Sequence, residues 1–445
     1  MTEQLERSAE ITKLARLLDV TVKDLAYLEH VSAAALAEFR EQVTDRLFAG
    51  DAGRLKRVAM SSKLLPIPLT VKIAQLAFGP MLCAATSGLI EPERAARISA
   101  RVPIPFLGDI ATMMDPRRAA DVIAAVPAQV VAQVGRHLIE RDEYVTMGRF
   151  VSFLPRETLR VALQEIPDDA ALLRVAFVLE GKDRLDELLD VARDRILGLI
   201  RAAHEHDMWG EVLDLISNLN LANRAELGDL AATQDDDVLD ALIGAAQRMQ
   251  AWPDLLPVIA AMSPPSLHRL LQVPAVLETD VLDQIATAAT QHDGWGELLP
   301  IAAVLPPEAR RRLVALPLVQ RDDVLAAIID AAVATRAWPA LVPLVAELPP
   351  DPRRRAAQAI GRLPAPVLTA ALAELGSVLT ADLAPSAWAA LVEIKDDLPD
   401  PVRRAIVVSA QGAGRDDVVA VLSAGSGRAA RPRPRPEPRA DPSGL

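Results

Sequence analysis

The sequence predicts an all-α fold, an α-solenoid of short helices in repeats of about 43 residues. Three observations lead to this prediction. Apolar residues recur at the i, i+3, i+4, i+7 spacing of helices, and the alternation typical of strands is scarce. Proline-rich turns recur at a regular interval. Four of the five tryptophans fall 43 residues apart, at Trp209, Trp252, Trp295 and Trp338.

Residues 1–60 are expected to form a helical N-terminal cap. Leu14, Leu18, Val22 and Leu25 give one amphipathic stretch, and the residues up to Phe48 give a second. A terminal solenoid repeat needs such a cap to shield its outer face. The first residues are charged and polar and lack the hydrophobic region of a signal peptide, so we expect a cytoplasmic protein.

Residues 61–190 are expected to hold apolar helices followed by the first, degenerate repeats. The segment 64–90 is long and apolar, with Lys72 as its only charge. A membrane-spanning helix needs about 20 apolar residues, but prolines and a Gly-Pro step divide this segment into shorter pieces. We therefore expect two buried helices, and the alternative is insertion into a membrane or attachment to its surface.

Residues 191–423 are expected to form tryptophan-phased repeats of three short helices. The second helix follows each tryptophan, with Asp254 as the expected N-cap in one copy and Pro257 in the first turn. The third helix begins at a proline pair. None of these helices could bury its apolar face alone, so the repeats must stack. In one first helix the apolar stripe consists of Leu239, Leu242, Ile243 and Ala246.

Each tryptophan stands at the start of a second helix, and we interpret it as a spacer in the core between consecutive repeats. The alternative is an aromatic ladder that grips a ligand, but large aromatics at this spacing are more often buried. Residues 424–445 are rich in Arg and Pro and are expected to be disordered. This tail could bind an acidic surface or act only as a solubilising tail.

The segments 114-MDPRRAADVIAAVP-127 and 154-LPRETLRVALQEIP-167 share an Ala- and Leu-rich helix that ends in an aliphatic-Pro step. Over about residues 104–170, the chain resembles the cytosolic N-terminal superhelical domain of MgtE-family magnesium transporters. The resemblance implies contact and regulation by a superhelix, and we expect a right-handed α-solenoid. No acidic position matches a magnesium-sensing residue, so neither transport nor magnesium binding is carried over. Beyond this region the repeats resemble HEAT or armadillo arrays only in general style.

No set of residues typical of an enzyme is visible, so we expect no catalytic, cofactor-binding or metal-binding residues. The sequence contains no glycine-rich phosphate loop and no nucleophile elbow. Cys83 lies in the apolar segment without a nearby histidine and is expected to be an inert buried thiol. His204 and His206 would point about 200° apart on a helix, so they cannot share one metal ion.

Arginines near the start of the third helices are the candidate binding residues. Positive charge near a helix N-terminus opposes the helix dipole, which costs a few tenths of a kcal/mol per residue. In a stacked array these side chains would align as a basic stripe that docks an acidic protein, a phosphorylated tail or anionic lipid headgroups. The alternative is a solvated, charge-patterned face. The candidates are Arg117, Arg118, Arg311, Arg312, Arg354, Arg355, Arg403 and Arg404.

The net charge of −12 disfavours bulk binding to nucleic acid, which needs a positive field. We therefore expect a non-enzymatic scaffold or adaptor in the cytoplasm, with another protein as its partner. Arginine far outnumbers lysine, which is typical of a bacterial genome of high GC content. The alternative is a peripheral protein at the inner face of the membrane, or an ion-homeostasis regulator related to the MgtE domain.

Overall fold

The computed structural model describes residues 2–18, 20–49, 65–364 and 385–423, together with scattered positions at 55, 59–60 and between 366 and 380. The C-terminal tail, residues 424–445, lies outside these residues. The described residues form short helices and turns and contain no strand, so the predicted all-α solenoid is confirmed.

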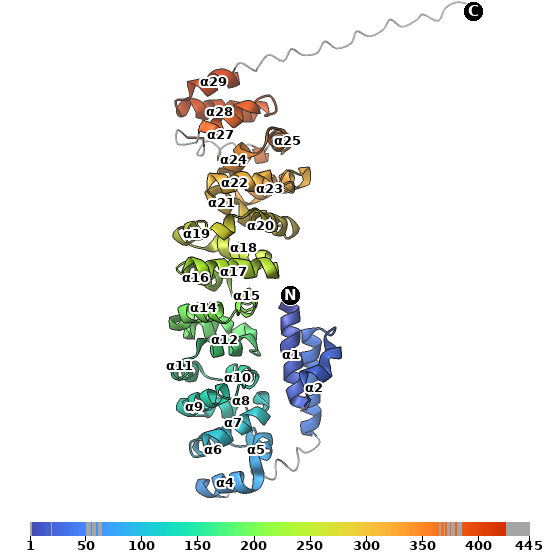
Figure 1. The fold of residues 1–445 in the computed structure, drawn as a ribbon, viewed down its shortest axis with the longest axis vertical. Coiled ribbons are helices and arrows are strands. Elements are labelled where there is room, and N and C mark those ends of the chain that lie inside the picture. Colours follow the sequence, from blue (N-terminus) through green and yellow to red (C-terminus); the bar gives the residue numbers. More distant parts are fainter. Residues whose placement is uncertain are drawn as a thin grey trace, which may run out of the picture. The chain divides into compact units, whose positions relative to one another are not determined.

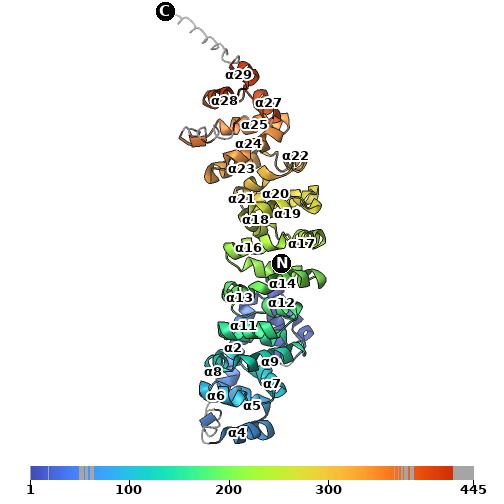
Figure 2. The ribbon, with the colours of Figure 1, turned by 90° about the vertical axis from the view of Figure 1, so that its left-hand side faces the viewer.

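The chain divides into two compact units, Met1–Ala275 and Val276–Leu445. Within each unit, consecutive helices follow one another in layers (Figure 2). The boundary predicted after residue 190 does not separate units, because α12 (Asp169–Phe177) packs against α14 (Ile196–Glu205) and α15 (Trp209–Ser217) on its far side.

In the first unit, two helices and a 3-10 turn form an N-terminal hairpin, and the remaining helices form a stack. The hairpin consists of α1 (Thr2–Leu18), η1 (Val22–Leu28) and α2 (Ala33–Ala49). The stack continues through α4 (Ile67–Ile73), η2 (Ala74–Phe78), α5 (Gly79–Ser87), α6 (Pro92–Ser99), α7 (Ile104–Met113), η3 (Pro116–Arg118), α8 (Ala120–Ala125), α9 (Ala128–Ile139), α10 (Tyr144–Val151), α11 (Arg156–Glu165), α12, η4 (Lys182–Arg184), α13 (Leu185–Val191), η5 (Arg193–Arg195), α14, α15, α16 (Leu221–Ala231), α17 (Asp236–Met249), α18 (Trp252–Ala261) and α19 (Pro264–Leu270).

The second unit begins within the short turn η6 (Pro274–Leu277) and has the same order of first, second and third helices. Its helices are α20 (Thr279–Gln291), α21 (Trp295–Val304), α22 (Pro307–Ala315), α23 (Asp322–Thr335), α24 (Trp338–Glu347), α25 (Pro350–Ile360), α27 (Pro385–Glu393), α28 (Asp400–Gly412) and α29 (Asp416–Ser423).

The N-terminal hairpin has an apolar core of its own, and it lies alongside helices of the first unit (Figure 1). Its ion pairs reach η3 and Glu180, which lie well inside the stack. The cap expected to shield the first stacked helices therefore makes its ionic contacts elsewhere. The five buried residues of the hairpin core are Ile11, Leu14, Ala15, Leu25 and Leu36.

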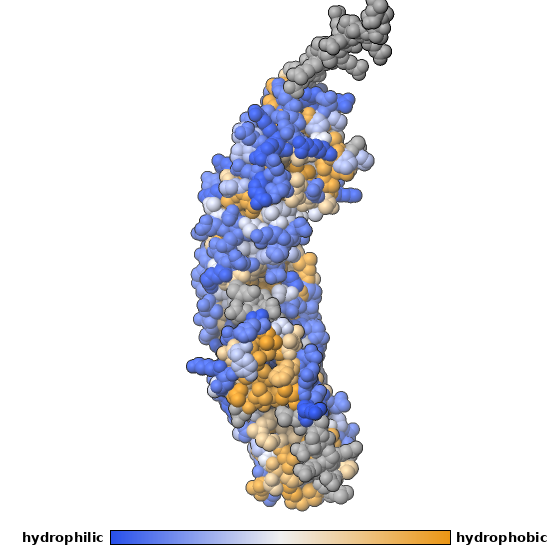
Figure 3. Space-filling view, turned by 90° about the vertical axis from the view of Figure 1, so that its right-hand side faces the viewer, coloured by the Kyte–Doolittle hydropathy of each residue, from blue (hydrophilic) through white to orange (hydrophobic). Residues whose placement is uncertain are grey.

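The segment from α4 to α5 differs from the prediction of two buried helices. It forms a run of helix interrupted by the π-helical turn η2 and by Gly79, whose φ is +70°. Leu76 is 86% exposed and Met81 is 72% exposed. The prediction of burial was therefore wrong for the outer side of this segment. Figure 3 shows apolar side chains gathered on the surface of this part of the first unit.

A backbone turn fixes the phase of the repeats. The residue two positions before each phased tryptophan adopts the left-handed conformation. The next N–H donates to a carbonyl five residues earlier in the first helix, which ends that helix. The second helix then begins at the tryptophan itself, so Asp254 is not the N-cap and Pro257 lies inside α18. The left-handed residues are Asp207, Gln250, Asp293 and Arg336.

The tryptophans are buried in the core, as predicted. Trp209 is 3% exposed and packs with Ala170 of an earlier helix and with Val238 and Ala245 of a later one. The helix of Trp209, α15, accordingly packs against α12 before it and α17 after it. The fifth tryptophan, Trp388, is fully buried in the same manner.

We predict that Trp295→Ala lowers the free energy of unfolding by about 3–5 kcal/mol, because it leaves a large cavity in the core. Trp295→Phe should cost on the order of 1 kcal/mol, because the buried indole N–H has no acceptor among the described residues and nothing polar is lost with it. Urea denaturation of the full chain measures both. Equal losses for the two variants would contradict the proposed role as an apolar spacer.

Candidate interaction surface

The arginines of the third helices divide into three groups with different contacts. The first arginine of each triplet faces the C-terminal carbonyls of the preceding second helix. Arg310 Nη1 donates to the carbonyl of Ala303 at 3.3 Å, and Arg353 Nη2 donates to that of Leu348 at 2.7 Å. A helix C-terminus carries partial negative charge. The cost expected from placing these cations near one helix N-terminus is therefore offset by the C-terminus of another helix.

The third arginine forms a contact that we name the arginine clamp. Arg269, Arg312 and Arg355 lie 43 residues apart. Each donates to the backbone carbonyl 35 residues earlier, at 3.4, 2.9 and 2.8 Å. These carbonyls immediately precede the first helix of the same repeat. The clamp therefore ties the start of the first helix to the third helix. The accepting residues are Gln234, Leu277 and Gln320.

A carboxylate strengthens the clamp in two repeats. Arg269 pairs with Asp236 at 2.5 Å, and Arg355 pairs with Asp322. Thr279 stands at the equivalent position in the repeat of Arg312, which keeps only the carbonyl contact. In the repeat before that of Arg269, the two charges are exchanged. Arg193 stands at the position of the clamp aspartate and pairs with Glu226, which stands at the position of the clamp arginine.

The middle arginine of each triplet, and Arg404 at the equivalent position of α28, points away from these contacts. Arg311, Arg354 and Arg404 are exposed, and each lies four residues after the first residue of its helix, α22, α25 or α28. Arg311 and Arg404 donate to carbonyls of their own helix. Arg354 faces Asp351 at 3.8 Å and Asp397 at 4.0 Å.

The other candidates of the stripe are engaged in local ion pairs. Arg403 pairs with Asp400 of its own helix and is mostly buried. Arg117 and Arg118 pair with Asp115, at 3.2 and 3.4 Å, and also with the N-terminal hairpin. Burial opposes the charge of Arg117, but hydrogen bonding and the charges of its three carboxylate partners raise its pKa overall. Among the candidates, only the middle arginines are therefore both exposed and outside the clamps and the contacts with the hairpin.

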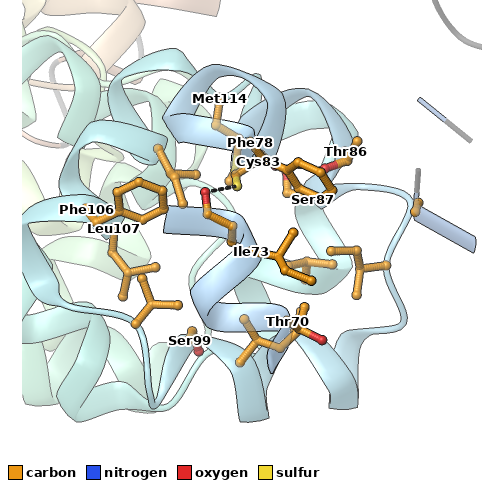
Figure 4. Close-up of a pocket in the computed structure, with 18 of the residues that line it drawn as sticks. Thr70, Ile73, Phe78, Cys83, Thr86, Ser87, Ser99, Phe106, Leu107 and Met114 are labelled. Atoms are coloured by element: carbon orange, nitrogen blue, oxygen red, sulfur yellow. Dashed lines mark hydrogen bonds between the residues drawn. The ribbon is translucent and has the colours of Figure 1, made fainter. Parts of the chain in front are cut away.

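An apolar cavity of about 160 Å³ lies among α4 to α8 (Figure 4). Its polar side chains donate to backbone carbonyls of their own helices: the Thr86 hydroxyl donates to Leu82 at 2.8 Å, and the Ser99 hydroxyl donates to Ala96 at 2.9 Å. The thiol of Cys83 lies 3.9 Å from the carbonyl of Ala74, and burial raises its pKa to about 11. A neutral thiol in an apolar cavity offers little nucleophilic chemistry.

The histidine cluster does not form a metal site. His204 lies in the last turn of α14, and its Nε2 is 3.6 Å from Asp237, while His206 is exposed. Within the described parts of the chain, no group of three or more His, Cys, Asp or Glu side chains could hold a metal ion. One run of helix, Ile67–Ser87, has the length and composition to cross a membrane.

These elements define a helical-repeat protein. No protein-family model matches the chain, and no curated protein matches it. Two solved structures are similar to it at 14% sequence identity. One is an engineered protein, with a TM-score of 0.20, covering 83% of this chain and 97% of its own. The other is a circular tandem repeat protein with novel repeat topology, with a TM-score of 0.16, covering 95% of this chain and 94% of its own.

We predict that reversing either charge of the clamp, as in Asp322→Arg or Arg355→Asp, lowers the free energy of unfolding by about 0.3–1 kcal/mol, because the pair is partly exposed. The double reversal should recover most of this loss, as the natural pair Arg193–Glu226 suggests. Urea denaturation measures the coupling between the two sites.

Asp330→Arg is the matched control, since this exposed carboxylate lies on the same helix α23 outside the clamp. Strictly additive losses in the double reversal would show that the two side chains do not act on one another.

Proposed function

We propose that this protein is a non-enzymatic helical-repeat scaffold that binds a protein partner. The tryptophans and most large apolar side chains are used in stacking the helices. The arginine clamps hold helices of one repeat together. The cavity among α4 to α8 is apolar, and the serine and threonine hydroxyls described above donate to backbone carbonyls. These features favour a binding surface over a reaction centre. We also propose that the protein is cytoplasmic.

The observation that carries this proposal is the row of middle arginines in the second unit. Arg311, Arg354 and Arg404 repeat at the same position of successive third helices, although the clamps do not use them. Arginine forms bidentate hydrogen bonds with carboxylates, which favours an acidic protein as the partner. A repeated, exposed cation of this kind supports recognition of an extended acidic segment.

We predict that reversing this row, in the triple variant Arg311→Glu, Arg354→Glu and Arg404→Glu, reduces recovery of the partner at least tenfold in affinity purification from the native host. Cross-linking of the unchanged protein should place the partner on α22, α25 and α28. Circular dichroism checks that helicity is retained.

The control variant changes net charge by the same amount through Arg201→Glu, Arg248→Glu and Arg362→Glu, which are exposed arginines outside the row. Unchanged recovery in the first variant, or an equal loss in both, would contradict the proposed surface.

A second candidate function is attachment to an anionic membrane surface, and the α4–η2–α5 segment favours it. Only 22% of its most apolar window is buried. Leu76 and Met81 project from it into solvent, and Lys72 is its only charge. Exposed apolar side chains next to a basic residue are typical of helices that lie in a lipid interface. An ion-homeostasis role related to the MgtE domain rests on sequence resemblance alone.

For this second function, we predict that the intact protein floats with vesicles containing phosphatidylglycerol, and that Leu76→Glu with Met81→Glu abolishes flotation. Inserting two carboxylates into the lipid interface is costly, so the loss should be complete. Val304→Glu with Val408→Glu, two exposed apolar positions in the second unit, is the control. An intact protein that stays with the soluble fraction would exclude this function.

A further inference from the structure

The N-terminal hairpin is bound to the stack of the first unit by charged side chains. Arg117 Nη1 lies 3.1 Å from Glu41 of α2, and Arg118 Nη2 lies 2.6 Å from Asp45, also on α2. Further along, Arg40 Nη2 lies 3.0 Å from Glu180 of the stack. The two carboxylates of α2 are four residues apart, so they lie on one face of the helix. That face points to η3 and to the loop that follows α12.

The buried apolar residues of the hairpin pack within the hairpin itself, whereas Tyr27 and Phe39 are exposed. Its buried cluster comes entirely from residues 11 to 36, and α1 packs on α2. The pairs that Arg117 and Arg118 form with α2 are partly exposed, and such pairs are individually weak and screened by salt. The pair of Arg40 with Glu180 is mostly buried. The hairpin therefore combines a core of its own with an attachment to η3 that can be exchanged.

The surface under α2 combines cations with carboxylates in a fixed order. Arg117 and Arg118 flank Asp115 at one end. At the other end, Glu180 lies 3.8 Å from Arg149. Arg149 is nearly buried, and this burial lowers the pKa of its guanidinium, although the charge of Glu180 opposes the shift. A ligand with a uniformly anionic surface would be repelled by Asp115 and Glu180. A helix with a cation beside two carboxylates matches both ends, as α2 does with Arg40, Glu41 and Asp45.

We propose that this surface, formed by Arg117, Arg118, Arg149 and Glu180, is a docking site for an acidic helix of a partner protein, and that α2 occupies it in cis. The partner helix carries carboxylates at positions i and i+4 and a cation at i−1. Binding in trans requires the hairpin to leave, so the hairpin limits access to the site. This inference rests on the proposed scaffold function and names a second contact surface for it, in the first unit.

The test uses the full chain and a fluorescent synthetic peptide of residues 33–49, the sequence of α2. An opened variant, Glu41→Arg with Asp45→Arg, removes the attraction between α2 and η3. We expect this variant to bind the peptide at least tenfold more tightly than the unchanged chain, as measured by fluorescence anisotropy. Adding Arg117→Glu and Arg118→Glu to the opened variant should abolish binding of the peptide.

Two controls keep the result specific. Glu29→Arg with Glu38→Arg makes the same charge change on the hairpin at exposed positions outside the contact, and it should leave peptide binding as weak as in the unchanged chain. A peptide with both carboxylates changed to arginine should bind to a chain with Arg117→Glu and Arg118→Glu alone, in which Glu41 and Asp45 of α2 are repelled from the site. This rescue would show direct pairing, and circular dichroism confirms that each variant is folded.

A second measurement does not depend on the peptide. Raising NaCl from about 50 mM to about 500 mM should speed hydrogen exchange in α2 of the unchanged chain, because salt screens its attachment. Exchange in α12 should stay the same.

Equal peptide binding by the opened and unchanged chains would overturn the proposal. Binding of the opened variant to phosphatidylglycerol vesicles through Arg117 and Arg118, without binding of the peptide, would overturn it in favour of a lipid ligand. The triple variant Arg311→Glu, Arg354→Glu and Arg404→Glu should leave binding of the peptide unchanged. Peptide binding without any cross-linked partner in the native host would then refute the scaffold function alone.

Discussion

Burial of the apolar face of each repeat by its neighbours is the interaction on which the rest of the structure depends. Isolated helices shorter than about 12–15 residues are marginal in water, and α18, α21 and α24 have only ten residues each. Their stability therefore comes from the helices packed against them within their own unit. The tryptophans make this dependence visible, because each phased tryptophan is buried at the start of a second helix. Every exposed feature of the surface, including the arginines, takes its position from this packing.

The regular spacing of the tryptophans made the repeat predictable from sequence, and the order of three helices followed from the proline-rich turns. The left-handed turns were not predictable in the same way, because Gln250 and Arg336 are not residues that favour this conformation. The start of the second helix was therefore placed too late. Burial of the α4–α5 segment was also misjudged, since composition alone does not say whether a neighbouring helix covers the outer side.

The arginine clamp could have been found from the sequence. Arg269, Arg312 and Arg355 share one phase with acidic residues 33 positions earlier, at Asp236 and Asp322. Periodicity by itself assigns all the arginines of a triplet to one stripe, whereas their directions on the helix separate them. The contacts of the hairpin had no such signal. They join positions 41 and 117 or 40 and 180, which no repeat relates, so they emerge only when the chain is folded.

The reversed pair Arg193–Glu226 carries information about how the array arose. Copies of one ancestral segment would begin with the same charge at each equivalent position, so this pair records two substitutions in succession. A direct exchange of the two charges passes through a sequence with like charges side by side. Both positions remain well exposed to water, with half of the Arg193 side chain accessible, and the penalty for such an intermediate is at most about 1 kcal/mol. Tandem duplication followed by drift through a tolerated mismatch accounts for the exchange.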